Sequence, residues 1–192
     1  MHGLLHKPKL VAVTSCGQGA GVTSIAVGLA AALSQTGEGN VLLVDMNSDR
    51  GASQHFRNGA PLQGLGEALE KKTRQNALVQ SNLYVANEGA ENNPSAQLVP
   101  GEFAHLLPKL KASDYDYIIF DMPPVSQTSV TPRVARLLDF VLFTVESEKT
   151  SQEVARHALA LLAESKVSVG AVLNKSRRYV PTRLHKDFLS EA

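Results

Sequence analysis

The chain has 192 residues, of which 43% are hydrophobic and 19% are charged, with 19 Lys and Arg against 18 Asp and Glu. This length fits a single domain, and the apolar content is enough for a sizeable core, which excludes a mainly disordered chain. A net charge of +1 gives no basic footprint for nucleic acid, and one cysteine excludes an internal disulfide framework and a cysteine-based zinc site.

Short runs of β-branched and other apolar residues recur along the chain and predict buried strands. These runs lie at 10–15, 41–45, 83–86, 117–121, 140–145 and 167–173. Uninterrupted runs of this kind favour parallel strands that are covered on both faces. No apolar run approaches the roughly 20 residues that a membrane-spanning helix needs, and the N-terminus lacks the pattern of a secretory signal.

Helical patterns and a polar loop lie between these runs. The stretch 24–33 is apolar almost all round, which indicates a helix buried against a sheet, and 150–164 has helical periodicity. The second helix is predicted to pack through Val154, Ala155, Ala158, Leu161 and Leu162. The stretch 87–101 is predicted to be a long surface loop, and the basic run at 71–74 a solvated helix end.

Strands that alternate with helices predict an α/β fold. We expect a doubly wound, mostly parallel sheet with helices on both faces, a three-layer sandwich of the P-loop NTPase or Rossmann-like kind. We expect one domain over residues 1–192, with an N-terminal extension at 1–8 and a C-terminal tail at 182–192.

A glycine-rich stretch, CGQGAGVTS at 16–24, follows the first predicted strand and precedes the first predicted helix. In this context glycines let several backbone N–H groups point at one anion, and the helix N-terminus adds its positive dipole end. The Walker A pattern GxxxxGK[ST], aligned on Gly21 and Thr23, puts Val22 at the lysine. The stretch is therefore either a phosphate-binding loop without its strongest side-chain contact or only a tight turn between strand and helix.

Two aspartates end predicted strands, Asp45 and Asp121. In open α/β sheets ligands bind beyond the carboxyl ends of the strands, where a carboxylate can hold Mg²⁺ or one of its waters. An aspartate at a strand end can also cap a helix or fix a loop. Their order along the chain together with the glycine loop favours descent from a nucleotide-binding site.

Three segments carry a resemblance to bacterial tyrosine kinases, which belong with the MinD and ParA ATPases to the deviant-Walker group. VAVTSCGQGAGVTSIAVGLAAAL, VLLVDMNSDR and YDYIIFDMPPVSQTS resemble the Walker A, Walker A′ and Walker B segments of that family. The resemblance extends from about Lys9 to Pro181. It implies nucleotide contacts from Gly17, Gly19, Gly21, Thr23, Ser24 and Asn174, Mg²⁺ contacts from Thr23, Asp45 and Asp121, and a catalytic role for the two aspartates in any active form.

The departures from the family pattern fall on catalysis. Val22 replaces the Walker A lysine, Gly17 stands where MinD and ParA carry their signature lysine, and Asn47 replaces the second acid of Walker A′. The usual tyrosine-rich tail is missing, with Tyr179 the only late tyrosine, and 1–9 is too short for the usual oligomerisation helix. Loss of one cation near the transferred phosphate should cost on the order of several kcal/mol of transition-state stabilisation. This figure is by analogy with the removal of other preorganised donors from active sites.

The resemblance therefore implies a stand-alone pseudokinase with no nucleotide or only weak binding of ATP or ADP with Mg²⁺. Such a protein would be a regulatory or scaffolding subunit of exopolysaccharide biosynthesis and export. It would be cytoplasmic, recruited to the inner membrane by the cytoplasmic tail of a polysaccharide co-polymerase, and a homo- or hetero-oligomer, without nucleic acid or direct membrane insertion. Arg177, Arg178 and Tyr179 are its candidate partner contacts. A weakly active kinase or ATPase and a MinD- or CpaE-like positioning protein are the alternatives.

Overall fold

The computed structural model describes residues 8–37, 39–47, 51–52, 56, 63–88, 100–126 and 128–177. Its six longer strands agree with the predicted runs to within one or two residues at each end. They are β1 (Lys9–Ser15), β2 (Val41–Asp45), β5 (Leu83–Asn87), β6 (Tyr117–Asp121), β7 (Phe140–Glu146) and β8 (Ser168–Asn174). Two short strands, β3 (Gln63–Gly64) and β4 (Leu78–Gln80), carry no sequence signal because so few residues form no apolar run.

Helices connect these strands, and local sequence explains several of their ends. They are α1 (Val22–Gln35), α3 (Leu65–Ala68), the 3-10 helix η1 (Arg74–Ala77), α4 (Pro100–Ala112), α5 (Thr131–Ala135) and α6 (Gln152–Ala163). The Ser151 hydroxyl accepts a hydrogen bond from the Val154 N–H at 3.3 Å and so caps α6. The stretch 89–99, which holds most of the predicted long loop, lies outside the described residues.

The sheet has the order β3-β5-β2-β6-β1-β7-β8, with β4 added antiparallel beside β5. All other pairings are parallel, so the carboxyl ends of these strands lie along one edge of the sheet. β1 sits between β6 and β7, where the chain winds outward in both directions. The predicted doubly wound, mostly parallel α/β fold is confirmed.

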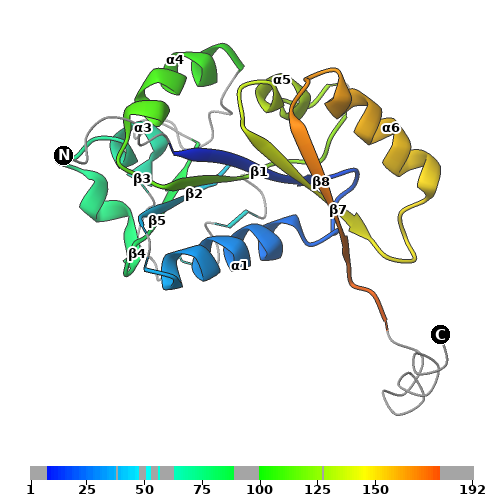
Figure 1. The fold of residues 1–192 in the computed structure, drawn as a ribbon, viewed down its shortest axis with the longest axis horizontal. Helices are drawn as coiled ribbons and strands as arrows, with labels where there is room; N and C mark the ends of the chain where they lie inside the picture. The colour runs from blue at the N-terminus through cyan, green and yellow to red at the C-terminus, as the bar shows by residue number, and fades with distance from the viewer. Residues whose placement is uncertain are drawn as a thin grey trace.

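Helices cover both faces of this sheet, as Figure 1 shows with α1 on one side and α4, α5 and α6 on the other. Alternate strand residues supply two apolar clusters. Leu42 and Phe120 belong to the larger one, with α4, α5 and α6, while Leu43 and Ile119 belong to the smaller one, with α1. Because the central strands bury both faces, their sequences read as uninterrupted apolar runs.

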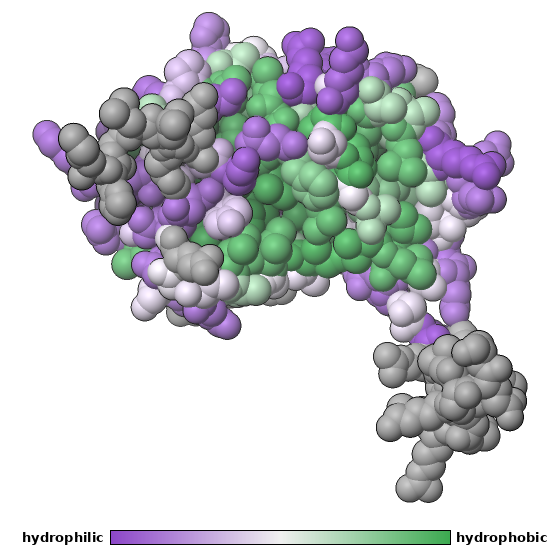
Figure 2. All heavy atoms as spheres, viewed as in Figure 1, coloured by the Kyte–Doolittle hydropathy of each residue, from purple (hydrophilic) through white to green (hydrophobic). Residues whose placement is uncertain are grey.

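Three packing expectations were wrong in part. β8 is an edge strand rather than one covered on both faces, and Leu173 near its end is 62% exposed. Val154 does not pack against the sheet, since it is 50% exposed in the first turn of α6. In α1 only every fourth residue from Val22 to Ser34 is buried, so that helix is covered along one stripe. Figure 2 shows apolar residues reaching the surface over β7 and β8.

Arg74 also departs from its prediction, because it is not at a solvated helix end. Its guanidinium lies 5.4 Å from the ring centroid of Tyr84 and 5.9 Å from that of Tyr115, and it pairs with Asp114. The Tyr115 hydroxyl donates to the Ala68 carbonyl at 2.7 Å. This cluster joins η1 to β5 and to the segment that precedes β6, away from the edge at which the glycine loop lies.

Candidate functional site

The glycine loop joins the end of β1 to the start of α1. Gly19 has φ +82 and Gly21 has φ +89, in the left-handed region that glycine reaches without strain. Gly21 precedes α1 and no side chain caps that helix. The N-terminal N–H groups of α1 therefore retain the anion-binding potential of an uncapped helix start.

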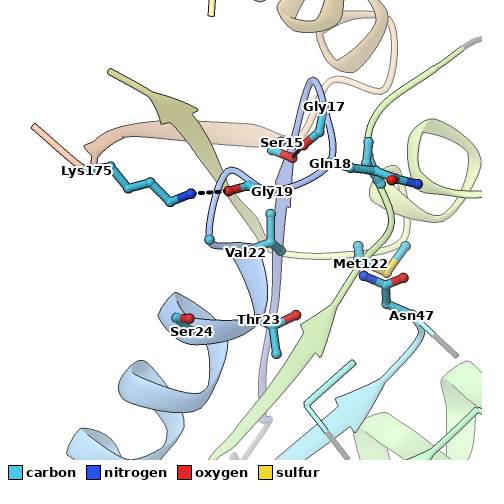
Figure 3. Close-up of a pocket in the computed structure, with 12 residues that line it drawn as sticks. Ser15, Gly17, Gln18, Gly19, Val22, Thr23, Ser24, Asn47, Met122 and Lys175 are labelled. Atoms are coloured by element: carbon cyan, nitrogen blue, oxygen red, sulfur yellow. Dashed lines mark hydrogen bonds between the residues drawn. The ribbon is translucent and has the colours of Figure 1, made fainter. Parts of the chain in front are cut away.

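A cavity of about 500 Å³ opens at this loop, as Figure 3 shows. Its wall contains the five predicted residues of the loop and helix start together with residues from four other segments. The lining residues are Ser15, Gly17, Gln18, Gly19, Gly21, Val22, Thr23, Ser24, Asn47, Met122, Pro124 and Lys175. The loop after β6 is held against β1, since the Val125 N–H donates to the Ser15 carbonyl at 2.7 Å. The cavity therefore lies at the carboxyl ends of the strands, beside the glycine loop.

Val22 is the residue in this wall that departs most from a phosphate site. It is 8% exposed, lines the cavity and packs into the apolar cluster beneath α1. Where a Walker A lysine would bring an ammonium group to the β- and γ-phosphates, the cavity has a hydrocarbon surface. The backbone of the loop therefore fits a phosphate group, and this side chain does not.

The carboxylates of Asp45 and Asp121 lie on neighbouring strands in direct register. They are 3% and 0% exposed. Burial raises the pKa of Asp121 to about 7, opposed by a hydrogen bond from Thr23 and reinforced by the charge of Asp45. The Thr23 hydrogen bond brings Asp121 to the start of α1, next to the glycine loop, and Asp45 is the neighbour of Asp121 on β2.

Both carboxylates are turned toward the segment 51–52 rather than into the cavity wall. The Ala52 N–H donates to Asp121 Oδ2 at 3.0 Å, and the Asn47 N–H donates to Asp45 Oδ1 at 2.9 Å. Asp45 lies so close to Gly51 that a Cβ there would sit 1.7 Å from Oδ1. Asp121 Oδ1 is buried without a hydrogen-bond partner among the described residues. The two carboxyl groups therefore accept hydrogen bonds from backbone N–H groups, and Asp121 Oδ1 is left for a proton or a cation.

These positions bear on the Mg²⁺ prediction. Thr23 and the unpartnered Asp121 oxygen are hard oxygen donors of the type that Mg²⁺ prefers. Among the described residues no group of three or more His, Cys, Asp or Glu side chains is placed to hold a metal ion. Any Mg²⁺ at Thr23, Asp45 and Asp121 would thus depend on waters and on phosphate oxygens, and those three residues remain predicted ligands.

The end of β8 supplies two contacts to the loop. Asn174, a predicted nucleotide contact, donates from Nδ2 to the Ala20 carbonyl at 2.9 Å and lies against Gly21, where a Cβ would be 2.3 Å from Nδ2. It is not in the cavity wall. Lys175 is in that wall and was not a predicted site residue, because the family resemblance implied a contact only for its neighbour Asn174.

The candidate partner contacts are less completely described. Arg177 is exposed at the end of the described chain, while Arg178 and Tyr179 lie outside the described residues. Among the described helices none is both long enough and apolar enough to cross a bilayer.

The parallel sheet, the glycine loop before α1 and the two strand-end aspartates together have the fold of P-loop domains of the ParA and MinD type, which bacterial tyrosine kinase domains share. Residues 9–177 match the family model described as cellulose biosynthesis protein BcsQ. The chain therefore belongs to the BcsQ family.

Individual relatives bear out the resemblance to bacterial tyrosine kinases. The putative tyrosine-protein kinase CapB of Staphylococcus aureus is 27% identical over 174 residues, with 87% of this chain and 75% of the relative covered. The kinase domain of the Escherichia coli tyrosine kinase ETK superposes with a TM-score of 0.69 at 24% identity, covering 93% of this chain and 72% of that one. A ParA family ATPase from Chlorobium tepidum has a TM-score of 0.71 at 22% identity, covering 95% and 80%. The last two show the fold.

Proposed function

We propose that this protein is a pseudokinase that acts as a regulatory or scaffolding subunit of exopolysaccharide biosynthesis, in the production of cellulose. The observation that carries the proposal is Val22, an apolar side chain in the wall of the phosphate cavity at the Walker A lysine position. Phosphoryl transfer depends on cations that neutralise the transferred group, and this loop has none. Membership of the BcsQ family supports the link to cellulose.

The proposed partner is the cytoplasmic tail of a membrane polysaccharide co-polymerase, which would bring this cytoplasmic chain to the inner membrane. The support for a protein partner is indirect. Relatives named as tyrosine-protein kinases share the domain, and a domain that keeps this fold without the transfer lysine is left with binding as its role. Arg177, with Arg178 and Tyr179, supplies a basic and aromatic stretch suited to an acidic tail.

The test asks whether cellulose production needs catalytic turnover by this protein or only its presence. A strain that lacks the gene is complemented with the wild type, with Asp121→Asn and with Arg177→Glu, at equal protein levels. Cellulose output is then measured beside ATP hydrolysis and phosphotyrosine formation by the purified proteins. We expect Asp121→Asn to restore cellulose, Arg177→Glu to lower it, and all three to lack transfer activity. Wild-type transfer activity that disappears together with cellulose output in Asp121→Asn would refute the proposal.

Two alternatives rest on particular observations. A weakly active kinase or ATPase is favoured by the retained contact between Thr23 and Asp121 and by the unpartnered Asp121 oxygen, and the same turnover assay decides it. A MinD- or CpaE-like positioning protein is favoured only by the fold shared with a ParA family ATPase. That alternative predicts a polar or patterned location in cells that persists when cellulose synthesis is deleted.

A further inference from the structure

The strand β8 lies at one edge of the sheet and has none of the usual features that prevent an edge strand from pairing. Within the described chain it pairs only with β7, in parallel and without a bulge. Its seven residues, SVGAVLN, include no charged residue and no proline. Natural sheets normally protect such an edge with charges, proline or a bulge, because its backbone N–H and C=O groups are a template for another strand. The outer edge of β8 is therefore suited to pairing.

The hydrogen bonding of β8 shows which of its backbone groups point outward. The Ser147 N–H donates to the Asn174 carbonyl at 2.9 Å, so residue 174 directs its backbone groups toward β7. Successive residues of a strand direct these groups to opposite sides. Val169, Ala171 and Leu173 therefore direct theirs to the outer edge. Each of these residues offers one N–H donor and one C=O acceptor to a further strand.

The sequence of β8 is complementary to itself when a second copy runs antiparallel to it. In the register with a twofold axis at Ala171, small, apolar and polar positions each meet positions of their own kind or a glycine. The opposed pairs are Ala171 with Ala171, Gly170 with Val172, Val169 with Leu173, and Ser168 with Asn174. All three outward-directed residues then fall in hydrogen-bonded pairs. A shift by two residues would place Val169 or Leu173 opposite a residue outside the strand, so this register makes the most hydrogen bonds.

The side chains at this edge leave apolar surface that such a pairing would cover. Leu173 is 62% exposed, and Val169 packs on the same face of the strand against the larger apolar cluster. Opposed Val169 and Leu173 would thus extend that cluster across the axis. On the other face Gly170 leaves room for the ring of Phe140, since a Cβ there would lie 2.7 Å from Phe140 Cζ. Figure 2 shows apolar residues reaching the surface over β7 and β8.

We infer that two copies of this chain pair through the outer edges of β8, antiparallel about a twofold axis at Ala171, so that their sheets join into one. A twofold contact uses the same surface on both copies, so the assembly closes as a dimer. One short strand on each side is a small interface, below the roughly 800 Å² per partner of standard complexes, so we expect a micromolar dissociation constant. The pairing needs neither a nucleotide nor phosphoryl transfer and is independent of the proposed function.

The first test is sedimentation velocity of the full chain from about 1 to about 200 μM, a range that brackets a micromolar dissociation constant. Ala171→Pro removes an N–H that points to the outer edge and none that serves β7, and proline is tolerated at such positions of edge strands. We expect the wild type to dimerise over this range and Ala171→Pro to weaken the dimer at least about tenfold, because the pair on the axis loses both of its hydrogen bonds.

A second test asks whether the axis passes through Ala171. Ala171→Lys and Ala171→Glu each place two like charges directly opposite each other, which destabilises a strand pair. We expect each variant alone to dimerise several-fold more weakly than the wild type, and an equal mixture of the two to recover the dimer as a mixed pair. Ala32→Lys is the matched control, because Ala32 is exposed on α1, which covers a different part of the sheet. We expect it to leave dimerisation unchanged.

Hydrogen exchange locates the contact, since pairing should slow exchange of the β8 amides as the concentration of the chain rises. A wild type that stays monomeric at about 200 μM, well above a micromolar dissociation constant, would overturn the inference. So would a dimer that Ala171→Pro leaves unchanged, or a mixture of Ala171→Lys and Ala171→Glu that recovers nothing. A monomer whose β8 amides are protected at every concentration would assign the edge to another segment of the same chain. Thermal melting shows that each variant is folded, and the charged pair decides the matter if Ala171→Pro is not.

Discussion

The candidate site has two halves, the glycine loop and the pair of strand-end aspartates, and they differ in which feature of a phosphate site they keep. The glycine loop has the shape of a phosphate site, with left-handed Gly19 and Gly21 and a cavity at the helix start. Its Walker A lysine position is occupied by the uncharged Val22. The acid half keeps both carboxyl groups, but Asp45 and Asp121 accept hydrogen bonds from the backbone N–H groups of 47 and 52. Loop shape depends on backbone conformation, which the fold maintains, whereas each ionic side chain can change its partner with one substitution nearby.

The largest expected effect is on the acid half, through Asp121→Asn. The pKa of Asp121 is raised from 3.8 to about 7, so between these values the folded protein binds more protons than the unfolded chain. The free energy of unfolding therefore falls as pH rises from about 4 to about 7, by up to roughly 4 kcal/mol. Asparagine keeps an oxygen for the Ala52 N–H and cannot ionise. Urea unfolding at pH 5 and pH 8 should show this pH-dependent fall in the wild type and a much smaller one in Asp121→Asn.

The next effect is on the loop half, through Gly21→Ala. An added Cβ would lie 2.3 Å from Asn174 Nδ2, and φ +89 is strained for alanine. We expect a loss of about 2–3 kcal/mol in the free energy of unfolding, together with loss of any anion binding. Chemical denaturation measures the first and calorimetry with triphosphate the second. A fully stable variant would show that Asn174 does not clamp the loop.

Val22→Lys tests whether the loop half has lost only its charge. If the loop shape is intact, the new ammonium should raise the affinity for ATP with Mg²⁺ about tenfold or more, or at least about 1.4 kcal/mol. Calorimetry with ATP and Mg²⁺ on the wild type and on Val22→Lys measures this change. Unchanged affinity in Val22→Lys would place the defect in the acid half or in the loop shape.

The smallest effect comes from Gly28→Ala, which serves as a control for Gly21→Ala. Gly28 lies in the interior of α1 on its exposed stripe, and nothing lies within 4 Å of an added Cβ. Alanine is the better helix former, so the free energy of unfolding should rise by about 0.5–1 kcal/mol. Urea unfolding measures this increase, with no change in anion binding. A loss of stability would indicate that α1 is not the regular helix described here.

Much of the fold was predictable because local sequence reports burial directly. β2 and β6 bury both faces, and their runs match the strands residue for residue. The same logic misjudged β8, because an apolar sequence does not say which strand lies at the edge. It also misjudged Arg74, whose aromatic neighbours come from β5 and from the approach to β6.

The glycine loop, the strand-end aspartates and the missing lysine can all be recognised in the amino-acid sequence, since each depends on residues that are close in the chain. The contacts that these residues make are visible only in the folded protein. Folding turned Asp45 and Asp121 toward 51–52, put Asn174 against the loop and brought Lys175 to Gly19. Strand and loop conformation follow from local sterics and burial. The partner of a charge instead depends on which distant segments the sheet order brings together.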